Sequence, residues 1–254
     1  MTGAGEVVRL GALTSDEAAA RLGPGTALLL PVGSTEAHGP HLPLEADVII
    51  AEETARRSAR LLEAGGVPCL LLPPLAYSRA HCARGYPGTV SVSAEAARGL
   101  LADLCRSLAP PGGPLVCLVN GHLEPEHLRV LRDVAREAAA AGCRVVFPDH
   151  TRRRHVGALG EEFLQGGGHA GGYETSLVLA AGGRVDAAVL STLPANRVNL
   201  AEQIRKGVDD FRVMGGERAY FGDPAAASRE EGERLYGVLA AIVADAVRAA
   251  LDPS

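Results

Sequence analysis

The sequence contains no tryptophan, and five tyrosines and four phenylalanines are only 4% of its 254 residues. Apolar residues nevertheless make up 47% of the chain, which is the ordinary globular range. We therefore expect a core built mainly from leucine, valine and alanine. The scarcity of aromatic rings also restricts substrates that bind by stacking between them.

The five cysteines form no C-x-x-C pair, and their number is odd. Four of them lie in apolar runs, where a free thiol packs like a small hydrophobe. This usage is typical of a reduced, intracellular protein, so we predict a cytoplasmic location and no disulfide framework. A signal peptide is not evident, and no window of about 18 residues is continuously apolar, so no membrane partner is expected. The net charge of -5 argues against a nucleic-acid partner.

Short apolar runs alternate with helical patterns through the first 150 residues. We predict strands at 26–32, 67–73, 114–120 and 143–149, and helices at 47–62, 93–108 and from Pro125 onward. The second half is less regular, with helices predicted at 170–181 and 228–251 and a fifth strand at 186–192. Strands that alternate with helices indicate a mostly parallel sheet covered on both faces. The sequence thus predicts one α/β domain over residues 1–254, layered α/β/α.

Polar side chains follow each of the four predicted strands of the first half. In open parallel sheets, ligands bind beyond the carboxyl ends of the strands, so these side chains should converge on one edge. They are Glu36, His38, His41 and Asp47 after the first strand, Ser78 and His81 after the second, Asn120, His122 and Glu124 after the third, and Asp149 and His150 after the fourth.

Glutamate, aspartate and histidine without cysteine are nitrogen and oxygen ligands, which suit Zn, Mn or Fe. The pairs Glu36–His38 and His122–Glu124 each have one residue between them, so the two members cannot easily point at one ion. Two such pairs and one further carboxylate suit two ions about 3.5–4 Å apart. Asp47 is the natural bridge because it stands where a helix begins, a position that also suits a helix N-cap.

At these residues the sequence resembles the creatininase family. The resemblance is carried by "LPVGSTEAHGPHLPLEAD" at 30–47, "SRAHCARGYPGTVS" at 78–91, "NGHLE" at 120–124, "HAGGYETS" at 169–176 and "FGDPAAASREEGERL" at 221–235. It implies a layered α/β domain, usually assembled as a homohexamer. It also implies a metal-dependent hydrolase that acts on amide-type C–N bonds of small substrates.

The resemblance implies a ligand set for each of two divalent ions. Glu36, Asp47 and His122 would hold the first ion. His38, Asp47 and Glu124 would hold the second, and a water between the ions would be the nucleophile.

The resemblance also implies catalytic and substrate-binding residues. His169 would move protons and Glu174 would assist as a carboxylate. Ser78 matches a substrate-contacting position, and Leu123 lies between two implied ligands. Independently of the resemblance, the loop positions of His41 and His81 would let them line the pocket, and hydrogen-bonded loop histidines are an equal alternative.

Three departures from the family's patterns bear on the substrate. The branch that opens creatinine packs the flat ring with tryptophans, and it has an aromatic residue where Leu123 stands. The common family motif NGHGGN is here NGHLEP, which keeps Glu124 as a ligand but loses the asparagine. Gly172 stands where many members have glutamate. We therefore expect a substrate other than creatinine.

Two alternatives stay open at this point. The first is a peptidase that matures a small peptide, and the second is a non-catalytic metal-binding scaffold of the same fold. The arginine run at 152–154 is by default a solvated charge run, and the alternative is an anion subsite formed by Arg152, Arg153 and Arg154.

Overall fold

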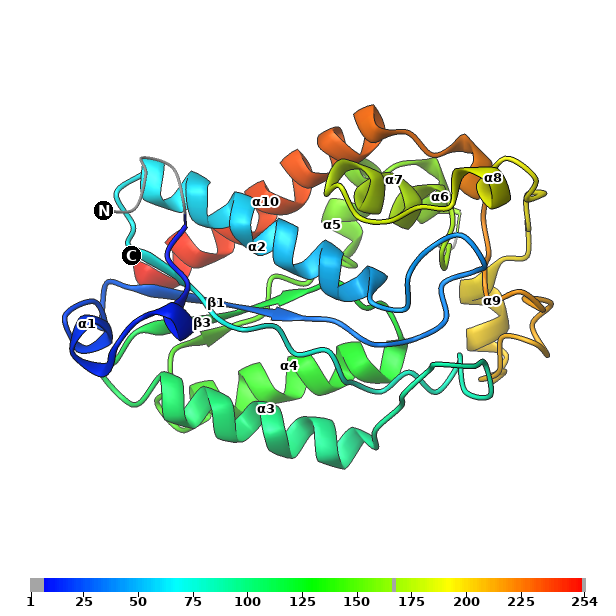
Figure 1. The fold of residues 1–254 in the computed structure, drawn as a ribbon. Coiled ribbons are helices and arrows are strands. Elements are labelled where there is room, and N and C mark those ends of the chain that lie inside the picture. Colours follow the sequence, from blue (N-terminus) through cyan, green and yellow to red (C-terminus); the bar gives the residue numbers. More distant parts are fainter. Residues whose placement is uncertain (1–6, 166–167, 253–254) are drawn as a thin grey trace.

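The computed structural model of the protein describes residues 7–165 and 168–252. Its centre is a four-stranded parallel sheet in the order β2-β1-β3-β4 (Figure 1). The strands are β1 (Ala27–Val32), β2 (Cys69–Leu71), β3 (Leu115–Asn120) and β4 (Val145–Val146). All six residues of β1 and of β3 are buried, as expected for parallel strands covered on both faces.

Helices cover both faces of this sheet (Figure 1). Helices α2 (Ala46–Ala64) and α10 (Arg229–Leu251) pack on one face, where Ala55, Leu62 and Val247 belong to a shared core with Leu29. Helices α3 (Ala94–Leu108) and α4 (Pro125–Ala140) pack on the other face. The predicted layered α/β/α architecture is therefore confirmed.

Shorter elements complete the described chain. They are η1 (Leu10–Ala12), α1 (Ser15–Ala19), α5 (Arg153–Val156), η2 (Gly157–Leu159), α6 (Glu161–Leu164), α7 (Gly172–Ala180), α8 (Ala187–Leu190), α9 (Leu200–Arg205) and η3 (Pro224–Ala226). The five cysteines are free and buried, which agrees with the absence of a disulfide framework. Among the described residues, no helix has the length and apolarity needed to cross a membrane.

Three local predictions were wrong. The run at 186–192 is not a strand, because the Asp186 side chain accepts a hydrogen bond from Val189 N and opens the short helix α8. The fourth strand is much shorter than 143–149, because only two residues pair with β3. Asp47 is not the N-cap of its helix; α2 begins at Ala46, so Asp47 lies in the first turn and Glu45 is the cap residue.

The strand order explains why a site forms at the carboxyl edge. From β1 the chain crosses to β2 on one side, and it then returns to place β3 on the other side of β1. The loops that follow β1 and β3 therefore lie at a topological switch point, where ligands bind in open parallel sheets. The first of these loops carries Glu36 and His38, and the second carries His122 and Glu124.

Candidate metal centre

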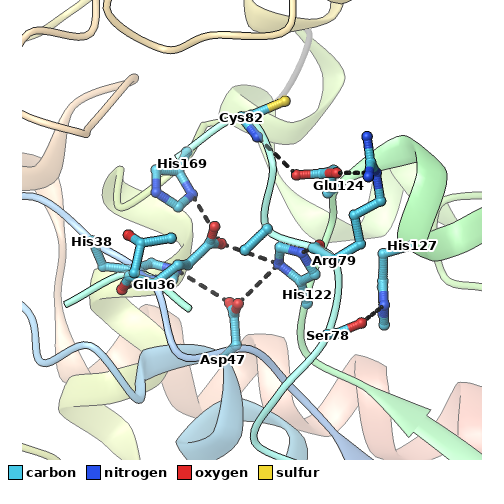
Figure 2. A network of polar contacts seen from close by, with 12 residues as sticks. Glu36, His38, Asp47, Ser78, Arg79, Cys82, His122, Glu124, His127 and His169 are labelled. Carbon is cyan, nitrogen blue, oxygen red and sulfur yellow. Dashed lines mark hydrogen bonds and ion pairs between the residues drawn. The ribbon is translucent and has the colours of Figure 1, made fainter. Parts of the chain in front are cut away.

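Asp47 stands at the middle of a buried polar cluster (Figure 2). Its Oδ1 lies 3.1 Å from His38 Nε2, and its Oδ2 lies 2.9 Å from His122 Nδ1. The Oδ2 atom is buried and has no hydrogen-bond partner among the described residues, although it lies close to His122. One carboxylate thus faces a different histidine with each of its two oxygens, which is the arrangement a bridging ligand needs.

Three overlapping groups of side chains have ligand atoms within 4.8 Å of one another. Each residue in them is buried, and three of the residues belong to two groups. The groups are Glu36, Asp47 and His122; His38, Asp47 and Glu174; and Glu36, His38 and His169.

The three histidines of this cluster share one hydrogen-bond pattern, in which one ring nitrogen of each lies on a backbone carbonyl oxygen. His38 Nδ1 lies 3.1 Å from the Glu36 carbonyl oxygen, His122 Nε2 lies 2.7 Å from that of Arg79, and His169 Nε2 lies 2.8 Å from that of Ala37. A carbonyl can only accept, so each ring donates from this nitrogen and turns the other nitrogen toward the carboxylates. Metal-ligating histidines are typically held in this way. The donor set therefore fits divalent cations.

The shifted pKa values of the cluster show that its excess of carboxylates favours bound positive charge. Burial alone would disfavour a charged His38, but Asp47, Glu174 and Glu36 outweigh it and raise the pKa of His38 to about 10. The pKa of His122 is likewise raised, against burial, by Glu36 and Asp47. Burial raises the pKa of Glu174 to about 8. Protons thus balance carboxylates that are packed together in a low dielectric, and bound cations would replace those protons.

The structure brings together all but one of the predicted ligands. Glu36, His38, Asp47 and His122 lie in the cluster, and Glu174, predicted as an assisting carboxylate, is 3.6 Å from His38 Nε2.

Glu124 lies outside the three groups. Its Oε2 accepts from Cys82 N at 3.0 Å, and its Oε1 lies 3.3 Å from Arg79 Nε (Figure 2). In this structure Glu174, and not Glu124, is the carboxylate grouped with His38 and Asp47.

A pocket opens beside the cluster and reaches Glu36, His122, His169 and Glu174. Among the predicted substrate-binding residues, Leu123 lines it. Apolar side chains that the sequence did not single out form much of the remaining wall, namely Leu200, Ile204 and Phe211. For Leu200 and Ile204, the sequence signal is their spacing of four, which places both on one face of α9. Phe211 lies outside that helix and has no such signal.

Two predicted substrate-binding residues do not line this pocket. Ser78 is 1% exposed, and its hydroxyl lies 2.5 Å from His127 Nδ1. His81 is partly exposed, with Nε2 3.3 Å from an Asp209 carboxylate oxygen. His41, which the sequence also placed after the first strand, lies 2.9 Å from the Thr175 hydroxyl through Nε2.

The arginine run lies apart from this pocket's lining. Arg152 pairs with Asp149, which also binds Arg132, while Arg154 Nε lies 2.8 Å from His155 Nε2. Arg132, Arg152 and Arg154 border a separate surface depression. The anion subsite stays a prediction.

A parallel sheet with buried carboxylates and histidines clustered at its carboxyl edge defines an α/β protein with a candidate site for divalent metal ions. The sequence matches the creatininase family, described as creatinine amidohydrolase, over residues 11–247. The chain belongs to the creatininase family, and it is a hydrolase of that family.

Relatives of this chain differ in what their names say they act on. The mycofactocin precursor peptide peptidase of Mycobacterium ulcerans is 35% identical over 218 residues, which cover 82% of this chain and 79% of that protein. The creatinine amidohydrolase of Pseudomonas putida is 28% identical, with 97% of this chain and 98% of that protein covered.

Solved creatininase structures share the fold. One described as creatininase with Mn superposes with a TM-score of 0.69 at 27% identity, covering 96% of this chain and 98% of that one. A variant creatininase of Zn–Zn type gives a TM-score of 0.68 at 25% identity, with the same coverage.

Proposed function

We propose that the protein is a dinuclear metal-dependent hydrolase that cleaves the C–N bond of an amide or cyclic amide in a small substrate. The observation that carries this proposal is the position of Asp47, whose two oxygens face different histidines at 3.1 and 2.9 Å. Such a carboxylate suits two cations that share it.

The ligand groups suggest how two cations would be held. Glu36, Asp47 and His122 would hold one cation, as the family resemblance implies. His38 and Asp47 would hold the other with Glu174, the carboxylate that completes their group in the structure. Nitrogen and oxygen donors of this kind suit Zn or Mn, the metals named for the solved creatininases.

Two divalent ions at such a site would supply an activated water and polarise the carbonyl of the substrate. The protein's own part is proton transfer and positioning. Burial and the neighbouring His38 lower the pKa of His169 to about 4, so its ring is neutral near pH 7. Its Nδ1 carries no proton when Nε2–H donates to Ala37, so we propose that His169 first accepts a proton and then delivers it to the leaving nitrogen.

The wall of the pocket bears on the substrate. Leu123, Leu200, Ile204 and Phe211 surround the polar end, so a substrate with an apolar group next to its amide would bury that group there. Phe211 also stacks against His169, with ring centroids 4.6 Å apart, and so shields the proton-transfer residue from water.

The proposal is tested with protein loaded with Mn²⁺ or Zn²⁺ and a panel of cyclic amides, formamides and short peptides. Cleavage of one class by the loaded protein, and its loss after chelation and in His169→Ala, is the expected result. Two bound ions per chain without cleavage of any compound would favour the metal-binding scaffold.

A peptidase that matures a small peptide is the second candidate. It is favoured by the 35% identity to a protein named as a peptide peptidase, and by an apolar pocket that would accept a side chain next to the scissile bond. Short peptides with apolar residues near the cut should then be cleaved faster than cyclic amides of similar size.

A further inference from the structure

A chain of hydrogen bonds runs behind His122, outside the pocket. The Ser78 hydroxyl lies 2.5 Å from His127 Nδ1, and His127 Nε2 lies 2.8 Å from Asn120 Oδ1. Ser78, His127 and Asn120 are buried, and the His127 side chain is 0% exposed. Both ring nitrogens of His127 therefore have partners within the protein.

The backbone N–H and carbonyl of His122 determine which group donates in each of these hydrogen bonds. His122 N–H donates to Asn120 Oδ1 at 3.1 Å, and Asn120 Nδ2 donates to the His122 carbonyl at 2.6 Å. Asn120 Oδ1 is therefore an acceptor, and His127 Nε2–H must donate to it. With the ring proton on Nε2, the Nδ1 atom of a neutral His127 is an acceptor, and the Ser78 hydroxyl donates to it.

His127 thereby touches both supports of His122. At one end it holds Asn120, which brackets the backbone N–H and carbonyl of His122. At the other end it holds Ser78, the neighbour of Arg79, whose carbonyl oxygen accepts His122 Nε2–H at 2.7 Å. The two imidazole rings also lie against each other, with centroids 4.8 Å apart.

We propose that His127 is a positioning residue for the metal centre, which fixes the backbone and the ring orientation of His122 through Asn120 and Ser78. The inference rests on the proposed function, because His122 is the group it positions toward a cation. Loss of a residue that hydrogen-bonds to a metal ligand in this way typically lowers metal affinity by about 10–100-fold.

Two substitutions of His127 test its hydrogen bonds to Asn120 and to Ser78 one at a time. In His127→Gln the side-chain amide reaches the position of Nε2, so the bond to Asn120 is kept and Ser78 loses its acceptor. In His127→Asn the amide reaches the position of Nδ1, so the reverse holds. His150→Gln is the matched control, because His150 is also buried and lies in none of the three ligand groups.

The readout is Co²⁺ binding to the metal-free full chain, followed by the visible absorption of the ion and by competition with a chelator. We expect both His127 variants to bind at least one ion about tenfold or more weakly and to show an altered cobalt spectrum, while His150→Gln matches the parent. Unchanged affinity and spectrum in both variants, with a parent that binds Co²⁺, would overturn the inference and leave the proposed function standing. A parent that binds no Co²⁺ would overturn the proposed function itself.

Circular dichroism of the metal-free variants shows whether each has folded. Should both His127 variants fail to fold, Ser78→Ala removes one bond from the far end of the same chain of hydrogen bonds and leaves His127 in place. It is expected to weaken Co²⁺ binding as His127→Gln would. Parent-like affinity in a folded Ser78→Ala protein would then contradict the proposal.

Discussion

Gly121 lies against the first turn of α2 so closely that a Cβ on it would collide with the carbonyl oxygen of Asp47. The loop after β1 makes a similar approach, since a Cβ on Gly33 would lie 2.6 Å from Val48 N. The loops that follow the two central strands thus pack by backbone contact against the start of one helix. This packing brings the ligands of both loops within reach of Asp47.

The close approach of Gly121 makes it intolerant of a side chain. Gly121→Ala should destabilise the fold by about 3 kcal/mol, because the obstacle is backbone and cannot rotate away. It should also lower metal affinity by separating His122 from Asp47. Gly99→Ala on α3 is the control; a Cβ there meets nothing within 4 Å, and alanine should stabilise the helix by up to about 1 kcal/mol. Chemical denaturation of both variants measures the difference, and equal stability would contradict the packing argument.

The separation of metal binding from proton transfer can be tested at His169. We expect His169→Ala to keep its metal content and to lose at least about 99% of turnover, since general acid–base catalysis contributes roughly 10²–10⁴-fold. Elemental analysis and steady-state kinetics on the same preparation provide the two readings. Loss of an ion in this variant would instead make His169 a ligand, as its grouping with Glu36 and His38 allows.

Glu174 and Glu124 are the two candidate carboxylate ligands of the second ion. Glu174→Gln should reduce the content by one ion, because Glu174 is grouped with His38 and Asp47. Glu124→Gln should keep both ions, because Cys82 N and Arg79 hold the Glu124 carboxylate. Elemental analysis of the pair decides between them. The reverse outcome would restore the ligand set implied by the sequence resemblance.

Acid should weaken the fold through His150, away from the ligand groups. Burial lowers the pKa of His150 from 6.5 to about 4, so the unfolded chain binds the proton more readily between these values. The stability that this histidine contributes is complete above pH 6.5 and is lost as the pH falls to about 4. We expect it to amount to about 3 kcal/mol.

Urea titrations of the metal-free parent and of His150→Gln from pH 7 to pH 4 measure this contribution. The free energy of unfolding should fall less steeply with decreasing pH in the variant. Parallel curves for the two proteins would contradict a buried, neutral His150.

The alternation of short apolar runs with helical patterns predicted the layers. It also predicted that the ligands converge, because each apolar run marks a parallel strand and the loop with the ligands begins where that strand ends. Glu36, His38, Asp47 and His122 could be placed at one edge on this basis. The partners of Glu124 could not, since Arg79 and Cys82 belong to the segment after β2, and Cys82 is 42 residues away from Glu124 in sequence. The homohexamer and the cytoplasmic location stay predictions.

The second half of the chain was harder to predict for a different reason. Leu200, Ile204 and Phe211 reach the pocket from a short helix and an irregular segment, whose positions depend on tertiary packing more than on periodicity. The run at 186–192 has the composition of a strand, but the capping bond of Asp186 determines a helix instead. His127 gave no signal beyond its type, because its role depends on two partners that lie 49 and 7 residues away in sequence.

Whether Asp47 bridges two ions can be decided by measuring the metal content of the protein. Elemental analysis of protein purified without added metal is compared between the parent and Asp47→Ala, with circular dichroism to show that both are folded. We expect close to two ions per chain in the parent and a sharp fall in the variant. One ion or none in the parent, unchanged when Asp47 is lost, would contradict a bridging role for Asp47.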